Sequence, residues 1–115
     1  MDITVATEGF SAMGSESRLA VLQTLIKAGQ EGLPVGMIAD RTSIPGSTLA
    51  HHLKFLAAAG LITQNKEGRV IRCRADFDHL EALAAFILEQ CCAEAPSNDD
   101  RGKDDACESK REDAA

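Results

Sequence analysis

The sequence predicts a mostly helical fold with one small β-hairpin, and three patterns along the chain lead to this prediction. Apolar residues recur at helical spacing through most of residues 1–92. A tight turn, residues 42–46, separates two of the predicted helices, and two short β-prone runs follow with Gly68 in the loop between them. Two helices joined by a tight turn and followed by a hairpin form a winged helix-turn-helix.

The chain of 115 residues, 44% of them hydrophobic, suffices for one small domain. We expect a DNA-binding and dimerisation domain over residues 1–92 and an acidic, disordered tail over residues 93–115 that carries one cysteine. No apolar run approaches the roughly 20 residues that span a bilayer, so no membrane partner is expected. The first residues lack the basic and apolar regions of a signal peptide. A cytoplasmic protein with reduced cysteines is therefore expected.

The first half of the domain contains three predicted helices. The first covers residues 5–13, and Ser15 is placed to cap a second that continues to residue 28. One apolar face of this second helix is formed by Leu19, Leu22, Leu25 and Ile26. A short third helix begins at Pro34, a favoured residue in a first turn, and ends near residue 42.

The next helix, from a cap at Ser47 to Gly60, has two different faces. Leucines repeat at positions 49, 53 and 56, and this spacing directs them to the core. The opposite face is polar and basic, as a DNA recognition helix requires, and presents Ser47, Thr48, His51 and Lys54.

The β-prone runs 61–64 and 70–74 predict a hairpin whose basic residues lie at its tip and along one side, where Arg72 and Arg74 share a face. Such a hairpin is placed as a wing that touches phosphates or a minor groove; a merely solvated hairpin is the alternative. The last helix, residues 77–92, has an apolar stripe that no later helix can cover. We expect this stripe to pack against the first helix and a second subunit, which makes a homodimer.

Charge is unevenly distributed along this acidic chain. The net charge is −6, yet residues 41–74 carry +5. This local excess indicates an anionic partner such as the phosphate backbone of double-stranded DNA. We expect Ser47, Thr48 and His51 to touch base edges or phosphates, and Lys54, Lys66 and Arg69 to neutralise backbone charge.

Three stretches resemble the ArsR/SmtB family of winged-helix homodimeric repressors: residues 33–40, residues 44–62 with their Ser-Thr-Leu-Ala-His-His-Leu-Lys segment, and Glu67-Gly68-Arg69. The resemblance runs from about Met13 to Leu88 and departs at Ala50, where many members have serine. It implies a repressor that occupies operator DNA until an inducer binds, typically a metalloid, a transition metal or a reactive sulfur species.

The family's familiar inducer sites are mostly missing here. The helix before the turn has no cysteine, so one arsenic-type site is absent, as is the early cysteine of a persulfide-type pair. A zinc-type site on the last helix needs a spacing that Asp76, Asp78, His79 and the later Glu89 do not provide.

Three cysteines remain as candidate ligands: Cys91 and Cys92 at the end of the last helix and Cys107 in the tail. As(III) and Sb(III) are soft and take three thiolates in a pyramid, so we expect one of them as the inducer. Alternatives are another thiol-reactive signal (redox, persulfide or another metal) or a DNA-binding regulator without cysteine-based sensing. Cys73, on a strand, is predicted to be a small core residue.

Nothing in the sequence favours an enzyme. It contains no glycine-rich phosphate loop and no promising nucleophile with a base, so no catalytic residue and no catalytic cofactor are expected.

Overall fold

The structure, a computed structural model, describes residues 1–96. A one-turn 3₁₀ helix, η1, follows the second helix. The elements are, in order, α1 (Ile3–Ala12), α2 (Glu16–Ala28), η1 (Gly29–Glu31), β1 (Leu33–Pro34), α3 (Val35–Thr42), α4 (Gly46–Ala58), β2 (Ile62–Glu67), β3 (Val70–Ala75) and α5 (Phe77–Leu88).

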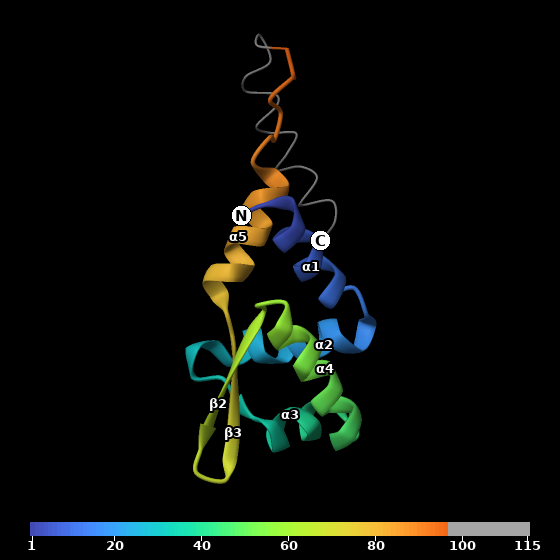
Figure 1. Ribbon diagram of the computed structural model, residues 1–115, viewed down its shortest axis with the longest axis vertical. Coiled ribbons are helices and arrows are strands. Elements are labelled where there is room, and N and C mark those ends of the chain that lie inside the picture. Colours follow the sequence, from blue (N-terminus) through green and yellow to red (C-terminus); the bar gives the residue numbers. More distant parts are fainter. Residues whose placement is uncertain (97–115) are drawn as a thin grey trace.

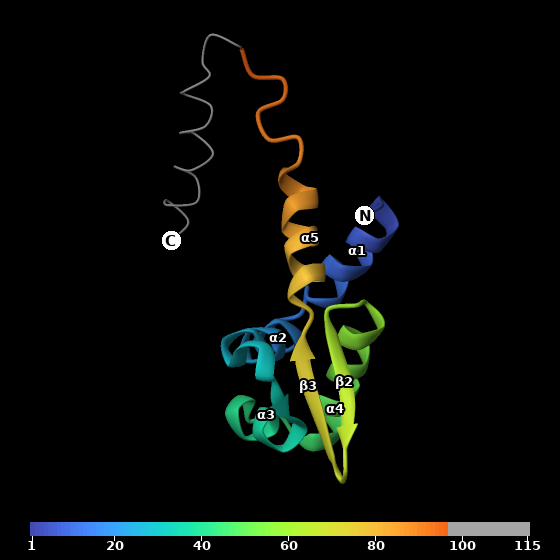
Figure 2. The ribbon, with the colours of Figure 1, turned by 90° about the vertical axis from the view of Figure 1, so that its left-hand side faces the viewer.

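These elements form three levels along the molecule. Helices α1 and α5 lie side by side at one end, helices α2 to α4 and the sheet lie in the middle, and the β2–β3 turn forms the opposite tip (Figures 1 and 2). The sheet is antiparallel with strand order β1-β3-β2. This arrangement confirms the predicted class, a mostly helical winged helix-turn-helix with a small β-sheet. None of the helices in residues 1–96 is long and apolar enough to cross a membrane.

The short strand β1 was not predicted, because Pro34 was expected to open a helix. Instead Leu33 pairs with Cys73 and Pro34 with Arg72, and α3 begins one residue later. Gly32 makes this pairing possible: its φ is +67°, and a Cβ there would lie 2.1 Å from the carbonyl oxygen of Cys73. Only glycine tolerates both the left-handed backbone and this close approach.

The core joins all five α-helices and the sheet. Its fully buried side chains include Val21, Leu22, Leu25, Ile38, Leu49, Leu53, Leu56, Leu61 and Leu83. The predicted leucines of α4 are confirmed, but on α2 the buried face was only partly identified. Leu19 and Ile26 are 39% and 40% exposed, whereas Val21 is buried. The buried stripe of α2 is centred on residues 21, 22 and 25, since helices and sheet pack on that side alone.

The ends of three helices are set by side-chain caps. Ser15 Oγ accepts a hydrogen bond from the backbone N–H of Arg18 at 3.4 Å, as predicted. Asp2 and Asp76 cap α1 and α5 in the same way, at 2.9 and 3.0 Å. These caps make α1 begin at Ile3 and not at Val5.

Helix α5 ends earlier than predicted, at Leu88 and not near Cys92. Beyond Leu83 it has no buried residue, and Ile87 and Leu88 are 61% and 56% exposed. Short helical segments gain most of their stability from tertiary packing, and the residues that follow Leu88 continue as turns.

Candidate nucleic-acid interface

The polar face of α4 is exposed along its length. Ser47, Thr48, His51 and Lys54 are all exposed, as the sequence predicted. On the other side Leu49, Leu53 and Leu56 are at most 1% exposed and fix the helix to the core. The helix therefore presents these four polar side chains on a rigid support, which suits the reading of a DNA groove.

The start of α4 differs from the prediction. Ser47 was expected to cap the helix, but the helix begins at Gly46, with Pro45 in the capping position and no side-chain cap hydrogen bond. Proline fits this place because its backbone is extended there, with φ −57° and ψ 147°. Ser47 consequently lies in the first helical turn, where its hydroxyl is not used to cap the helix.

On the wing, the two arginines of β3 are held by neighbouring groups. Arg72 Nε donates to Glu67 Oε1 at 3.0 Å, and Arg72 Nη1 donates to the carbonyl oxygen of Glu31 at 3.2 Å. Arg74 donates to Asn65 Oδ1 at 3.2 Å and to Glu67 Oε2 at 3.5 Å. They do share a face, as predicted, but Arg72 links the hairpin to η1 and Arg74 links β3 to β2.

The acid at the centre of this cluster is Glu67. The hydrogen bond from Arg72 and the charges of Arg72 and Arg74 hold the pKa of the Glu67 carboxyl below its usual 4.5, against a smaller opposing effect of desolvation. The carboxylate is thus ionised over the whole physiological range and keeps both guanidinium groups in place.

The remaining wing cations are Lys66 and Arg69. Both are exposed near the tip of the hairpin, and neither forms an ion pair within the described part of the chain. The turn between the strands contains Gly68 with φ +66°, a value that favours glycine. The wing therefore offers these two cations to an anionic partner, while Arg72 and Arg74 are occupied.

Phe55, which neighbours the exposed polar face of α4, was not predicted from the sequence. The Phe55 ring is 47% exposed, and its centroid lies 5.0 Å from that of His51 in an edge-to-face arrangement. The Arg18 guanidinium of α2 lies over the same ring, 5.0 Å from its centroid. The spacing of four residues between His51 and Phe55 was the available signal, because such residues are neighbours on a helix surface.

The predicted thiol site is described in part. The Sγ atoms of Cys91 and Cys92 lie 3.6 Å apart, in the turns that follow α5. Cys92 has φ +60°. The third candidate, Cys107, lies outside the described residues. Within residues 1–96 no three or more His, Cys, Asp or Glu side chains gather into a group that could hold a metal ion.

Cys73 is separate from this pair. It is fully buried, as predicted, and accepts a hydrogen bond from Gln64 Nε2 at 3.6 Å. Burial raises the pKa of the Cys73 thiol, which keeps it protonated and unreactive.

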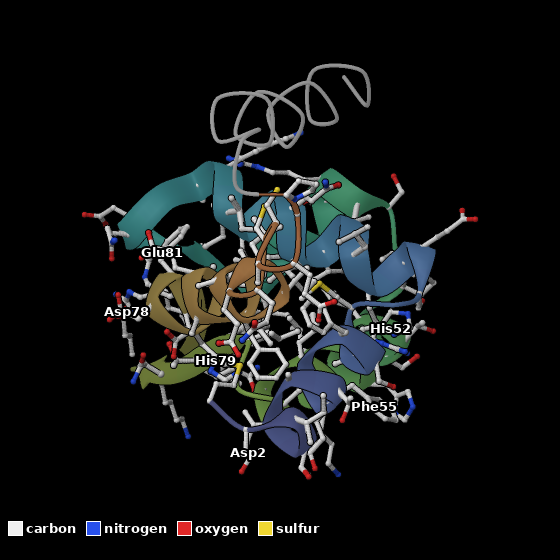
Figure 3. The ribbon with its side chains drawn as sticks, turned by 90° about the horizontal axis from the view of Figure 1, so that it is seen from above. Asp2, His52, Phe55, Asp78, His79 and Glu81 are labelled. Atoms are coloured by element: carbon white, nitrogen blue, oxygen red, sulfur yellow. The ribbon has the colours of Figure 1, made fainter. Side chains whose placement is uncertain are left out.

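The residues considered for a zinc-type site have structural contacts. Asp76 caps α5, and the ring of His79 packs against Gly60 at the end of α4. Figure 3 shows His79 on the α5 side of the molecule, away from His52 and Phe55.

A rigid polar recognition helix beside a basic wing defines the class of protein: a winged helix-turn-helix DNA-binding regulator. A family profile described as a helix-turn-helix domain matches residues 13–65. The HTH-type transcriptional regulator YceK of Bacillus subtilis is 35% identical over 68 residues, which are 59% of this chain and 67% of that protein.

Solved structures agree with this assignment. An ArsR-like transcriptional regulator from Rhodococcus sp. RHA1 is 32% identical, with a TM-score of 0.67 over 79% of this chain and 82% of that one. A protein named "Possible transcriptional regulator for arsenical resistance" is 26% identical, with a TM-score of 0.61 over 78% of this chain and 98% of its own. The chain belongs to the ArsR family of transcriptional regulators, which are not enzymes.

Proposed function

We propose that this regulator is a metalloid-responsive repressor. It binds operator DNA as a homodimer and leaves it when As(III) or Sb(III) binds cysteine thiolates near the end of α5. The observation that carries the sensing part of the proposal is the 3.6 Å contact between the sulfur atoms of Cys91 and Cys92.

DNA binding in this proposal uses α4 and the wing. Ser47, Thr48 and His51 face base edges or phosphates from the exposed side of α4. Lys54 follows on the same helix, and Lys66 and Arg69 supply charge from the wing to the phosphate backbone. Arg72 and Arg74 form ion pairs with Glu67, so they stabilise the hairpin and do not contribute charge to phosphate binding.

The homodimer in this proposal forms through α1 and α5. Ile3 of α1 is 66% exposed, and Ile87 and Leu88 of α5 are 61% and 56% exposed. The two helices lie together at the end opposite the wing tip (Figures 1 and 2). A second copy that covers these apolar side chains places two recognition helices side by side, at a spacing of roughly 34–36 Å for successive major grooves.

The thiol pair suits a soft trivalent ion. In the reduced protein two adjacent thiolates can bond to one small centre, and soft ions prefer thiolates to oxygen or nitrogen ligands. A pyramidal As(III) centre takes a third thiolate, for which we propose Cys107. The 26% identity to a protein named for arsenical resistance supports the same assignment.

Metalloid binding in this proposal acts on DNA through the dimer. The thiol pair directly follows α5, and α5 packs on α1 through Leu83 and Gly9. Capture of the ion changes the end of α5 and thereby the packing of the dimer helices. Coupling between an effector and a ligand is typically about 1–3 kcal/mol, or roughly 5–150-fold in affinity.

The proposal is tested by fluorescence anisotropy of the reduced protein on a duplex from upstream of its own gene, titrated with arsenite. We expect release at near-stoichiometric arsenite, and weaker arsenite binding at lower pH because the thiols must lose protons. Binding that arsenite leaves unchanged would reject arsenite sensing and favour another thiol-reactive signal.

Cysteine variants locate the site. Cys91→Ser should abolish release while it preserves DNA affinity, and Cys107→Ser should weaken the response to arsenite. The matched control is Cys73→Ala, at a buried position that the ion does not reach; once its folding is verified by thermal unfolding, it should respond as the wild type does. Intact release in Cys91→Ser would show that the proposed site is wrong.

A further inference from the structure

His51, a proposed DNA contact, does not stand alone on its helix. Phe55, one turn later on the same face, is 47% exposed although it is a large apolar side chain. It lies outside the buried core, so core packing does not account for its place. Its ring contacts His51 edge-to-face, with centroids 5.0 Å apart and an interplanar angle of 82°.

The ring of Phe55 is held by a second contact, from another helix. The Arg18 guanidinium lies 5.0 Å from the ring centroid, within the distance of a cation–π interaction. Arg18 is itself held, since its Nε donates to the carbonyl oxygen of Ala12 at the end of α1. Its backbone N–H is bound by the Ser15 cap.

Beyond Arg18, Phe55 borders an open groove between α1 and α4. The groove has a volume of about 540 Å³ and is lined from α1 by Thr7, Glu8 and Ser11. Figure 3 shows Phe55 at this edge of the molecule, beside α1. Because the groove is open, the ring is not enclosed there, and it contacts Arg18 on one side and His51 on its own helix.

We propose that Phe55 and Arg18 are positioning residues for His51 at the DNA interface. Arg18 fixes the ring of Phe55, and the ring fixes the imidazole of His51, whose nitrogens then point in one direction before DNA arrives. The direction of a donor or acceptor decides which base edge it can meet, and an ordered side chain loses less entropy on binding. This inference rests on the proposed DNA contact of His51.

The same contacts connect two parts of the protein. The carbonyl of Ala12 belongs to α1, which packs on α5 through Gly9 and Leu83. The orientation of His51 therefore depends on where α1 lies relative to α2 and α4. A displacement of α1 would therefore be transmitted to α4 through Arg18 and Phe55.

The first test needs no DNA. In the free protein, the imidazole resonances of His51 are compared by NMR between the wild type and variants. Phe55→Leu and Arg18→Gln should both shift these resonances toward those of an unstructured histidine, whereas Phe55→Tyr, which keeps the ring, should not. Lys27→Gln, which removes a cation at the far end of α2, is the matched control for Arg18→Gln. Unchanged His51 resonances in Phe55→Leu would overturn the inference.

The second test is a double-mutant cycle on DNA. Phe55→Leu should lower affinity for the upstream duplex about threefold to tenfold, the range of an aromatic pair, and Phe55→Tyr should restore it. In a His51→Ala background the same Phe55→Leu change should have little effect, because the side chain to be positioned is gone.

The outcomes separate the two proposals. Equal losses from Phe55→Leu with and without His51 would overturn the positioning role while DNA binding itself stands. A wild-type protein that binds the upstream duplex no better than random DNA would reject the proposed operator contact and, with it, this inference.

Discussion

The exposed apolar end of α5 offers a direct test of the proposed homodimer. Ile87 is 61% exposed and is not part of the buried core of residues 1–96. Ile87→Ala should therefore leave the fold of each protomer intact and weaken only the association of two copies.

The size of the effect follows from the exposure. Full burial of an isoleucine side chain stabilises by about 1.5–3 kcal/mol, so covering the exposed 61% is worth about 1–2 kcal/mol per protomer. A twofold interface contains the residue twice, which gives about 2–4 kcal/mol per dimer. The dimer dissociation constant should rise by roughly 30- to 1,000-fold.

Sedimentation velocity over a range of protein concentrations measures this constant. Met37→Ala is the matched control, because Met37 is 42% exposed but lies on α3, at the other end of the molecule from α5 (Figure 1). It should leave the constant unchanged. A dissociation constant for Ile87→Ala within about threefold of the wild-type value would refute a dimer interface that includes this part of α5.

Three further predictions concern the wing and the sheet. Lys66→Gln should weaken binding to all DNA sequences alike and reduce the slope of log affinity against log salt by about 1 in anisotropy titrations; an unchanged slope would remove Lys66 from the interface. Gly32→Ala should lower the free energy of unfolding by about 3 kcal/mol or more in urea titrations, because its Cβ would overlap a carbonyl of β3, whereas Gly68→Ala, at a similar φ but with open space around it, should lose about 1 kcal/mol. Arg72 holds the pKa of Glu67 below 4.5 in the folded state, so the stability that this carboxylate contributes is present above pH 4.5 and is lost as the pH falls through its folded pKa. Urea titrations should show that Glu67→Gln is less stable than the wild type at pH 6 and equally stable at strongly acidic pH. A difference in stability that persists at strongly acidic pH would contradict the assignment.

The helices and the hairpin could be predicted from the sequence because their signals are local. Leucines at positions 49, 53 and 56 already imply which face of α4 is buried, and Gly68 between β-prone runs implies the wing turn. The cap at Ser15 was predictable because serine just before a helix accepts a hydrogen bond from the backbone N–H three residues later. The resemblance of residues 33–40 and 44–62 then pointed to the family that the comparisons support.

Local sequence patterns gave wrong predictions of burial and strand pairing where tertiary packing determines both. Leu19 and Val21 are both apolar, and only the directions from which other elements pack on α2 buried one and left the other exposed. Pro34 has the residue type expected in a first helical turn, yet it pairs with β3 because Gly32 allows the two backbones to approach closely.

The candidate interface divides in the same way. The exposed polar residues of α4 and the local excess of positive charge can be read from the chain, because residue type and spacing define them. Which cations remain available could not be predicted, because it depends on which side chains meet across the folded hairpin and between packed elements. Arg72 donates a hydrogen bond to a carbonyl oxygen 41 positions earlier, and the Arg18 guanidinium lies over an aromatic ring of another helix. Such meetings are decided by the distances between packed elements, and those distances exist only once the chain has folded.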